Sequence, residues 1–464
     1  MGRDLTPRKT FGYTKQKELQ MTTTPVTETQ KKRLIKPSRG QARFAFTILL
    51  IINILNYADR YVLSAVLPQI KHEFNMTDFQ GGLLISSFLI VYAVTTLPIG
   101  IWADRGIRKN IVAICVGVWS VATTFAGFTR NLFQLFSMRS ILGIGEAGYA
   151  PASLSLLGDF FSKTHRGRIL SFWSIGTLIG AAIGVSVGGR IADTLGWRWA
   201  FYIVGIPGLI AAFLAWRIKE PKRGVFDTEE GESGENAADT STAHGKIDQN
   251  FWGTARALLR IPTYWVLLGA LTFSFFTIGG TSFWLTTYLT RAFSLSLTEA
   301  GSVSGIVLIV TGLTGTIIGG WLADFLQSRR PQGRMITSVL GFLLGAPLVL
   351  VALSIHIFPV FIGVFVVAAI SLNFCTGPLN AVIQDVIAPD MRATAVGLAL
   401  LLAHLLGDAA APTVIGFISD ISSLGTALLV TAPLFLFLAG LVSLIGVKTV
   451  ASDMRRMQEQ LRAR

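Results

Sequence analysis

Long, nearly unbroken apolar runs dominate the sequence and restrict its fold more than any other feature. They recur as segments of about twenty residues, separated by short charged loops. A helix needs about 20 apolar residues to cross the hydrocarbon core of a bilayer, whereas a barrel strand needs only ~9–11. Every backbone polar group must be hydrogen-bonded inside the bilayer, which helices achieve within one segment. The sequence therefore predicts an all-α membrane protein.

The apolar runs fall into two groups of six, which predicts about twelve transmembrane helices. The first group is expected over residues 43–217 and the second over residues 259–448. Residues 218–258 form a hydrophilic, acidic linker, and residues 1–42 and 449–464 form polar, basic tails. The N-terminal tail is expected to be disordered, because it has few apolar side chains for a core. Both Met1 and Met21 are possible start residues.

Composition agrees with a membrane protein and excludes other classes. Hydrophobic residues make up 51% of the chain and charged residues only 14%, against about 25% charged residues in soluble proteins. The net charge of +14 does not indicate nucleic-acid binding, because the basic residues gather in loops between apolar runs. Cys115 and Cys375 lie within apolar runs, so neither a disulfide framework nor a metal site is expected. No enzyme motif or cofactor site is predicted.

Lysine and arginine residues alternate between loops, and this pattern predicts the orientation in the membrane. The basic set of alternate loops contains Arg105, Arg108, Lys109, Arg166, Arg168, Arg329, Arg330, Arg334 and Arg392. The opposite loops hold little beyond Lys71, Arg130, Arg198 and Arg291. The positive-inside rule therefore places both termini and the linker in the cytoplasm. The expected location is the plasma membrane, or the inner membrane in a Gram-negative bacterium.

The two halves of the chain repeat each other. Gly100-Ile-Trp-Ala-Asp104 recurs 220 residues later as Gly320-Trp-Leu-Ala-Asp324, and a basic pair follows each copy. Arg166 and Arg392, 226 residues apart, each open the fifth span of their half. Two similar bundles around a central site are the plan of secondary transporters that work by rocking.

Two charged residues lie inside the fourth apolar run. Arg139 and Glu146 are almost two helical turns apart, so they share one helix face. In lipid, a charged side chain costs about 2.5–3.5 kcal/mol or more at the bilayer centre. This face is therefore expected to turn toward protein or a water-filled cavity, with Gly143, Gly145 and Gly148 allowing another helix to approach. A functional role is favoured, and a buried ion pair that fixes helix packing is the alternative.

Polar and aromatic residues in the fourth span and in spans of the second half are candidates for substrate contact. The candidates are Tyr149, Phe276, Trp284, Asn373, His404 and Asp408. His404 and Asp408 are one helical turn apart, so they form either a proton relay or a hydrogen-bonded packing pair. For Phe276 and Trp284, packing or contact with lipid is the alternative.

Several stretches resemble the spinster family of the major facilitator superfamily. The Gly100–Lys109 loop and its repeat resemble the loop motif of the superfamily, with the glycine shifted to Gly106. The stretches that resemble the spinster family are Asn56-Tyr-Ala-Asp-Arg60, Gly143-Ile-Gly-Glu-Ala-Gly-Tyr149, Glu220-Pro-Lys-Arg-Gly224, Ala403-His-Leu-Leu-Gly-Asp-Ala409 and Ile415-Gly-Phe-Ile-Ser-Asp420. The resemblance covers nearly the whole membrane domain, but neither residues 1–40 nor the acidic linker.

This resemblance implies a fold and a function. The implied fold is the major facilitator superfamily fold, with two pseudo-symmetric six-helix bundles. The implied function is secondary active transport of an amphipathic lipid, such as a lysophospholipid or a sphingoid phosphate, with proton coupling and alternating access. Proton-coupled symport of a small organic anion such as a sugar acid is the alternative, and a membrane sensor is a third possibility. The expected partners are the substrate, protons and membrane lipids, and the chain is expected to be monomeric.

The resemblance also implies roles for charged residues. The implied proton-coupling centre consists of Asp59, Arg60, Arg139 and Glu146. The implied gate consists of Asp104, Arg108, Asp324 and Arg329, the alternative being solvated loop charges. A buried carboxyl favours its protonated form when unpaired and its charged form beside an arginine. Glu146 is therefore expected to bind a proton on one side of the membrane and release it on the other, and Asp59 can share this proton.

The predicted orientation can be tested in the linker. A single cysteine introduced at Ser241 should resist labelling by an impermeant maleimide in intact cells, because the linker is expected to be cytoplasmic. Labelling is expected only after the cells are permeabilised. Efficient labelling of intact cells would contradict the orientation.

Overall fold

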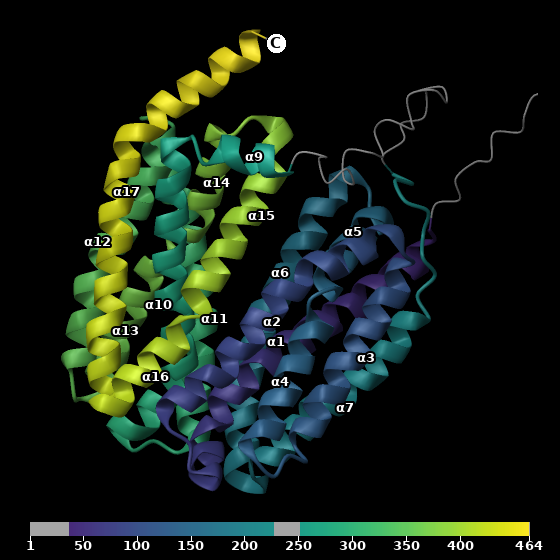
Figure 1. The fold of residues 1–464 in the computed structure, drawn as a ribbon, viewed down its shortest axis with the longest axis vertical. Helices are drawn as coiled ribbons and strands as arrows, with labels where there is room; N and C mark the ends of the chain where they lie inside the picture. The colour runs from purple at the N-terminus through teal and green to yellow at the C-terminus, as the bar shows by residue number, and fades with distance from the viewer. Residues whose placement is uncertain (1–36, 227–250, 464) are drawn as a thin grey trace, which may run out of the picture. The chain divides into compact units, whose positions relative to one another are not determined.

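The apolar runs fold into helices, as the sequence predicts. The computed structural model describes residues 37–226 and 251–463, so Ser241, most of the N-terminal tail and most of the linker lie outside the described residues. Eleven helices in the described ranges are long and apolar enough to cross a membrane. No β-strand occurs in these ranges. Figure 1 shows that the helices run along a common long direction.

The first bundle contains the predicted six spans in seven helices. These are α1 (Arg39–Phe74), α2 (Asp78–Arg105), α3 (Arg108–Ala126), α4 (Leu132–Glu146), α5 (Tyr149–Phe160), α6 (Lys163–Leu195) and α7 (Trp197–Trp216). The fourth predicted span is divided into α4 and α5, neither of which reaches the length of a full crossing. The count of eleven takes the interrupted stretches Phe358–Val386 and Thr394–Ile421 as one crossing each, and α4 and α5 together make the predicted twelfth.

The second bundle is interrupted more often. Its elements are α9 (Phe251–Leu258), α10 (Pro262–Phe293), α11 (Leu297–Gln327), α12 (Gly333–Ser354), α13 (Phe358–Asn373), α14 (Thr376–Val386), η2 (Pro389–Met391), α15 (Arg392–Ala403), η3 (His404–Asp408), α16 (Ala411–Ile421) and α17 (Leu424–Ala463). The short helix α9 lies in the region that the sequence assigns to the linker. The segment η3 is a π-helical turn, which divides the eleventh span between α15 and α16.

Matching capping boxes begin the second helix of each bundle. At α2, the Thr77 side chain accepts a hydrogen bond from the Gln80 backbone N–H, and the Gln80 side chain accepts one from Thr77. Ser296 and Glu299 make the same reciprocal contact at α11. A capping box provides acceptors for backbone N–H groups that have no partner inside the helix. These short motifs therefore fix where α2 and α11 start.

A stripe of glycines on α6 brings this helix against α1. A Cβ atom added to Gly180 would lie 2.4 Å from the Ile54 carbonyl oxygen, and one added to Gly184 would lie 2.4 Å from the Ala58 carbonyl oxygen. Gly176 and Gly188 continue the stripe at four-residue spacing, which keeps all four on one helix face. The close approach holds the middle of α1, where the charged residues of the first span lie.

Polar contacts join the two bundles at the end away from the linker. The Asp420 carboxylate of α16 accepts hydrogen bonds from the backbone N–H groups of Asp78 (2.7 Å) and Phe79 (2.9 Å) at the start of α2. The Asp78 carboxylate accepts hydrogen bonds from Arg291 of α10 (2.7 and 2.8 Å) and Ser419 of α16 (2.6 Å). A carboxylate at a helix N-terminus is favoured by the free N–H groups and by the helix dipole. Asp78 and Asp420 therefore tie α2 to the second bundle.

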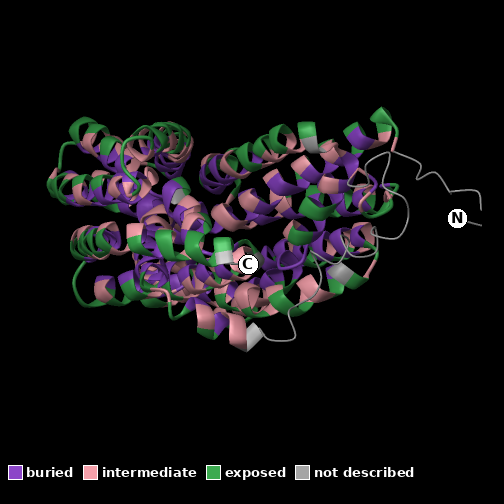
Figure 2. Cartoon of the chain, turned by 90° about the horizontal axis from the view of Figure 1, so that it is seen from above, coloured by how far each residue is buried: buried purple, intermediate pink, exposed green. Residues whose placement is uncertain are grey.

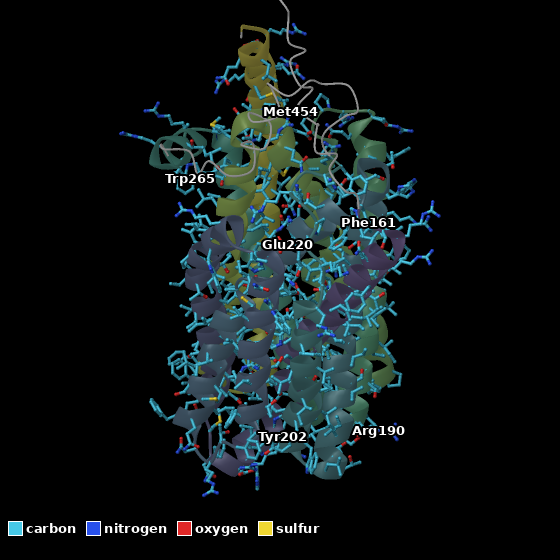
Figure 3. All side chains as sticks on the ribbon, turned by 90° about the vertical axis from the view of Figure 1, so that its right-hand side faces the viewer. Phe161, Arg190, Tyr202, Glu220, Trp265 and Met454 are labelled. Atoms are coloured by element: carbon cyan, nitrogen blue, oxygen red, sulfur yellow. The ribbon has the colours of Figure 1, made fainter. Side chains whose placement is uncertain are left out.

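The backbones of the two bundles also come close in this half of the molecule. A Cβ atom on Gly82 of α2 would lie 2.2 Å from the Pro412 carbonyl oxygen of α16, and one on Gly189 of α6 would lie 2.3 Å from the Leu297 carbonyl oxygen. Figure 3 shows Glu220 and Met454 toward one end of the bundles and Arg190 and Tyr202 at the other. The close backbone contacts lie at the end of the bundles that contains Arg190 and Tyr202. The loops next to the linker lie at the opposite end.

Large apolar side chains cover much of the accessible surface. Phe133, Ile317 and Ile421 are among those that are more than two-thirds exposed. Figure 2 shows exposed residues on the outward helix surfaces and buried residues between the helices. Such extended apolar surfaces are rare on soluble monomers, and lipid tails would cover them in a bilayer.

Replacing Gly184 with alanine should destabilise the first bundle. The added methyl group would contact backbone atoms of α1, and overpacking of this kind costs about 1–3 kcal/mol. We expect Gly184→Ala to lower the melting temperature of the purified protein in detergent. Gly363→Ala is the matched control, because a Cβ atom there meets nothing within 4 Å. Equal melting temperatures for the two variants would contradict the proposed packing.

Candidate functional site

Four charged side chains meet between α1 and α4 in the interior of the first bundle. Arg60 Nε donates a hydrogen bond of 2.6 Å to Glu146 Oε2, and Arg139 Nη1 lies 3.6 Å from Asp59 Oδ1. The Arg60 side chain is 16% exposed, whereas those of the other three residues are at most 1% exposed. The structure thus brings together the residues predicted for the proton-coupling centre, and only Arg60 reaches the accessible surface.

Neighbouring side chains complete the surroundings of these charges. The Thr123 hydroxyl on α3 donates a hydrogen bond to Asp59 Oδ2. The Arg60 guanidinium carbon lies 4.7 Å from the ring centre of Tyr92 and 5.3 Å from that of Phe88, distances at which cation–π attraction operates. Removing one partner of a buried ion pair costs about 3–5 kcal/mol, because the other charge is left uncompensated. Removing any one of the four charged side chains would therefore destabilise the others.

Some polar atoms of this cluster have no hydrogen-bond partner among the described residues. These atoms are Glu146 Oε1, Asp59 Oδ1, Arg139 Nε and Arg139 Nη2. Buried polar atoms are usually hydrogen-bonded, and exceptions are often found at functional sites. One oxygen of each carboxylate therefore accepts no hydrogen bond, and for Asp59 this is the oxygen that faces Arg139.

A break in the helix positions Glu146. Helix α4 ends at Glu146 and α5 begins at Tyr149, so the glutamate lies at the end of a helix rather than within one. Cβ atoms on Gly143 and Gly145 would lie 2.8 Å from the Phe88 carbonyl oxygen of α2 and 2.6 Å from the Trp119 backbone nitrogen of α3. As predicted, the glycines beside Glu146 permit close helix contacts.

Tyr149 links α5 to α1 and α6 through Asn53. The Tyr149 hydroxyl donates a hydrogen bond of 2.7 Å to Asn53 Oδ1, and Asn53 Nδ2 donates one of 2.7 Å to the Trp173 carbonyl oxygen. The Tyr149 ring also packs edge-on against Trp119, with the ring centres 5.0 Å apart. Tyr149 is buried in this conformation, and its contact with substrate remains a prediction.

His404 and Asp408 form a second ionisable pair, in the second bundle. His404 Nδ1 lies 2.8 Å from Asp408 Oδ2, and the imidazole stacks on Phe275 with the ring centres 4.9 Å apart. Both residues belong to the π-helical turn η3, where the Ala409 N–H bonds to the His404 carbonyl oxygen. Single π-turns within α-helices occur frequently at functional sites. The predicted pairing is present, and both the relay and the packing interpretation remain open.

The other predicted substrate contacts lie between helices. Phe276 stacks on Phe435 of α17 with a ring-centre distance of 3.7 Å. Trp284 is fully buried, and its Nε1 donates a hydrogen bond of 3.1 Å to the Pro412 carbonyl oxygen. Asn373 Nδ2 donates one of 2.8 Å to the carbonyl oxygen one turn earlier. These side chains contribute to helix packing in this state, and their role in substrate binding remains a prediction.

The predicted gate residues have different surroundings. Asp104 lies in the last turn of α2, and its side chain is outside the described residues. Arg108 is buried, forms an ion pair with Asp159 of α5, and donates a hydrogen bond of 2.9 Å to Glu220 Oε1. Asp324 is 81% exposed and lies 4.0 Å from Arg334. Arg329 lies over the Phe325 ring, 4.1 Å from its centre.

The structure reveals a repeated ion pair that the sequence analysis missed. Arg108 pairs with Asp159 in the first bundle, and Arg334 pairs with Asp385 in the second. Both members of the pair recur after 226 residues, the separation of Arg166 and Arg392. Applying this separation to every charged residue would have identified Asp159 and Asp385. Each pair joins helices of its own bundle at the linker end.

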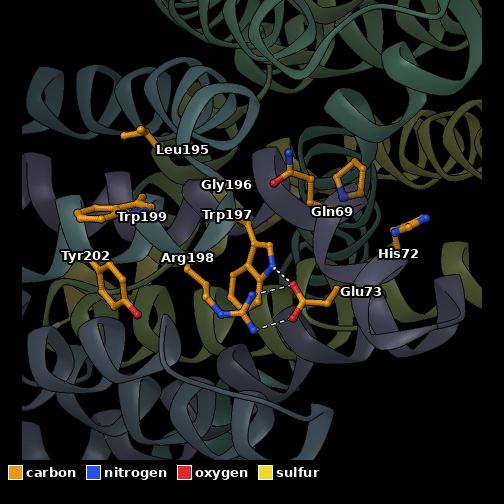
Figure 4. A pocket seen from close by; sticks show the side chains of 10 residues that line it. Gln69, His72, Glu73, Leu195, Gly196, Trp197, Arg198, Trp199 and Tyr202 are labelled. Carbon is orange, nitrogen blue, oxygen red and sulfur yellow. Dashed lines mark hydrogen bonds and ion pairs between the residues drawn. The ribbon is translucent and has the colours of Figure 1, made fainter.

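A cavity of about 800 Å³ opens at the other end of the first bundle. Figure 4 shows Glu73 bound by Trp197 and Arg198 in its wall. The Trp197 indole nitrogen donates to Glu73 at 2.7 Å, and Arg198 donates at 2.6 and 2.7 Å. Glu73 follows Arg60 by thirteen residues on α1, which places them about 20 Å apart along the helix. This cavity is therefore separate from the buried charges.

Comparison with known sequences identifies the family. The sequence profile of the Major Facilitator Superfamily matches residues 49–412. The chain is 30% identical over 407 residues to Protein spinster homolog 3 of Danio rerio, covering 82% of this chain and 78% of the fish protein. It is 27% identical to Protein spinster of Drosophila melanogaster over 399 residues, covering 84% of this chain. The chain spans only 63% of the length of the fly protein.

The fold also matches a solved structure. A bacterial homolog of the human lysosomal transporter Spinster, in an inward-facing and unoccupied conformation, superposes with a TM-score of 0.79 and 24% sequence identity. The match covers 90% of this chain and 99% of the bacterial chain. With its two bundles of membrane-spanning helices and its sequence similarity, this chain belongs to the spinster family of transporters within the major facilitator superfamily.

Proposed function

We propose that this protein is a proton-coupled secondary transporter that moves an amphipathic lipid across the membrane by alternating access. The observation that supports this most strongly is the Arg60–Glu146 ion pair, in which a fully buried carboxylate is held by an arginine whose side chain is 16% exposed. An arginine that reaches the accessible surface can bind an anionic head group, since guanidinium matches phosphate and carboxylate geometry. The pair therefore joins a site for protons to a site for anions.

Competition for Arg60 couples the proton to the substrate. When an anionic head group binds Arg60, Glu146 loses its closest cation, and a buried carboxyl without a partner is more stable neutral than charged. Glu146 then binds a proton at a carboxylate oxygen. Conversely, protonation of Glu146 releases Arg60 for the substrate. Proton and anion thus favour each other's binding, and this coupling is reciprocal.

Asp59 extends the proton site. It lies beside Arg139 and Thr123 in the same cluster as Glu146. Carboxyl groups that interact strongly titrate as a unit, so the proton belongs to the pair rather than to one residue. Glu146 couples proton and substrate more directly than Asp59, because Glu146 pairs with Arg60, which reaches the accessible surface, whereas Asp59 pairs with the buried Arg139.

The two bundles would act as bodies that rock against each other. Arg108–Asp159 and Arg334–Asp385 stiffen each bundle at the linker end, while Asp78 and Asp420 join the bundles at the opposite end. With the linker in the cytoplasm, as the positive-inside rule predicts, the conformation is closed toward the outside. Breaking the contacts of Asp78 and Asp420 would open that side.

A lipid is favoured over a small organic anion by the surroundings of Arg60. Tyr57, Phe88 and Tyr92 lie within 5.3 Å of its guanidinium carbon, measured to their ring centres. Aromatic and apolar walls suit an acyl chain, whereas a sugar acid would require several polar or cationic groups. Uptake assays with a lysophospholipid and a sugar acid distinguish the two candidates. Saturable transport of the sugar acid alone would favour the small organic anion.

Glu146→Gln should abolish transport driven by a pH gradient. Glutamine resembles the protonated acid in shape but cannot release a proton, so substrate exchange without a gradient should continue. We expect proteoliposomes containing the variant to lose the response to an imposed gradient while retaining downhill exchange of lysophospholipid. Retained exchange also controls for folding.

A normal gradient response in Glu146→Gln would exclude this residue from coupling. Asp59 and the His404–Asp408 pair would then be the remaining candidates for proton coupling. Glu73→Gln is the matched control, since it neutralises a carboxylate outside the cluster whose partners, Trp197 and Arg198, belong to the same bundle. This control should retain the gradient response.

Asp420→Ala should open the side of the protein away from the linker. The change removes two hydrogen bonds to the first turn of α2, and each bond to a charged group contributes about 1.5–3 kcal/mol. Spin labels at Thr194 and Ser423, one in each bundle, should show at least a tenfold larger open population by electron–electron distance measurements, since ~1.4 kcal/mol is tenfold.

Glu73→Ala is the matched control for Asp420→Ala. It removes a carboxylate at the same end of the protein, but its partners Trp197 and Arg198 belong to the same bundle. The distance distribution should therefore stay close to that of the wild type. An unchanged distribution in Asp420→Ala would show that the contacts of Asp420 do not control opening.

A further inference from the structure

A groove of about 440 Å³ lies at the linker end of the second bundle. It is formed by the turn between α11 and α12 and by the extension of α17. Its lining includes Arg329, Arg330, Ala451, Met454 and Arg455. Three arginines from two separate segments thus line one groove.

Contacts to the rest of the bundle hold both walls of the groove. On one wall, Gln327 Oε1 accepts a hydrogen bond of 3.1 Å from the Arg334 backbone N–H, and Arg329 is held over Phe325. On the other wall, the Asp453 carboxylate of α17 accepts hydrogen bonds from the Thr263 N–H (3.0 Å) and hydroxyl (2.6 Å) at the start of α10. The groove is therefore built into the fold.

The arginines of this groove are not neutralised by neighbouring acids. Within residues 37–226 and 251–463, no ion pair is formed by Arg330 or Arg455. The nearby carboxylate of Asp453 binds Thr263 and lies 3.7 Å from Arg456, which is outside the groove. Like charges gathered around one concave surface attract a counter-ion. Guanidinium groups bind phosphate especially well, through paired N–H donors.

The floor of the groove indicates the kind of anion. Ala451 and Met454 are apolar, and Met454 packs against the hydrophobic core. Figure 3 shows Met454 near the linker end of the bundles, where a membrane surface would lie. An apolar floor with a basic rim suits a phosphate attached to a glycerol backbone and acyl chains better than a free phosphate ion. We propose that this groove binds the phosphate head group of an anionic membrane lipid.

Bound lipid would connect two segments that the sequence separates widely. The head group would bridge Arg329 and Arg330 of the turn to Arg455 of α17. Arg334, which pairs with Asp385, lies at the start of α12 directly after this turn. The lipid would therefore stabilise the linker end of the second bundle and fix the extension of α17 in its present direction.

The double variant Arg330→Gln with Arg455→Gln tests this proposal in the full-length purified protein. Binding is measured by native mass spectrometry and by thermal shift, with phosphatidylglycerol, phosphatidylcholine or inorganic phosphate added to the detergent solution. We expect the wild type to retain phosphatidylglycerol in preference to phosphatidylcholine. The double variant should bind phosphatidylglycerol about tenfold more weakly, a difference of about 1.4 kcal/mol.

Arg456→Gln with Arg462→Gln is the matched control, because it removes two charges from the same helix outside the groove. The control should bind phosphatidylglycerol like the wild type, and both variants should melt at the wild-type temperature without added lipid. Equal loss in both variants would show diffuse charge attraction and overturn the site, as would unchanged binding in the double variant. Saturable binding of inorganic phosphate with the same dependence on Arg330 and Arg455 would identify a soluble anion instead of a lipid.

Discussion

Burial of charge in a membrane interior is the constraint on which this structure depends. Glu146 and Arg139 would be too costly in contact with lipid, so α4 must present them to protein. The partners come from α1, which supplies Asp59 and Arg60. Two arginines and two carboxylates give a neutral set when all are ionised. In the proposed mechanism, one added proton leaves an excess positive charge, and the anionic head group of the substrate offsets it.

Small residues make that arrangement sterically possible. Gly180 and Gly184 let the backbone of α6 press against α1, while Gly143 and Gly145 bring α4 against α2 and α3. The helix break after Glu146 interrupts the backbone hydrogen bonds of the fourth span next to the charges. The span nevertheless continues as α5. The glycines and the charged residues thus lie in the same few turns of helix. A substitution at one of these glycines would therefore also displace the buried charges.

The sequence predicts the helices well because each apolar run has the length and polarity of a membrane crossing. It predicts Arg139 and Glu146 from their positions in an apolar run, but it pairs them with Asp59 and Arg60 only through family resemblance, since spacing alone does not show that α1 touches α4. The division of the fourth span was missed because Ala147 and Gly148 are ordinary residues in membrane helices. The partners of Arg108 were missed because Asp159 and Glu220 lie far along the chain, and their proximity depends on tertiary packing.

The attachment of α2 to Asp420 has a consequence for hydration. Two backbone N–H groups in the first turn of α2 have their acceptor in the other bundle, while the capping box at Thr77 provides acceptors elsewhere in that turn. If α16 moved away, these two groups would need new acceptors, because unpaired backbone N–H groups are unfavourable when shielded from solvent. Water is the only small molecule abundant enough to replace a carboxylate there. Separation of the bundles at this end would therefore wet the helix terminus, so the proposed opening would take up water and would be opposed by osmotic pressure.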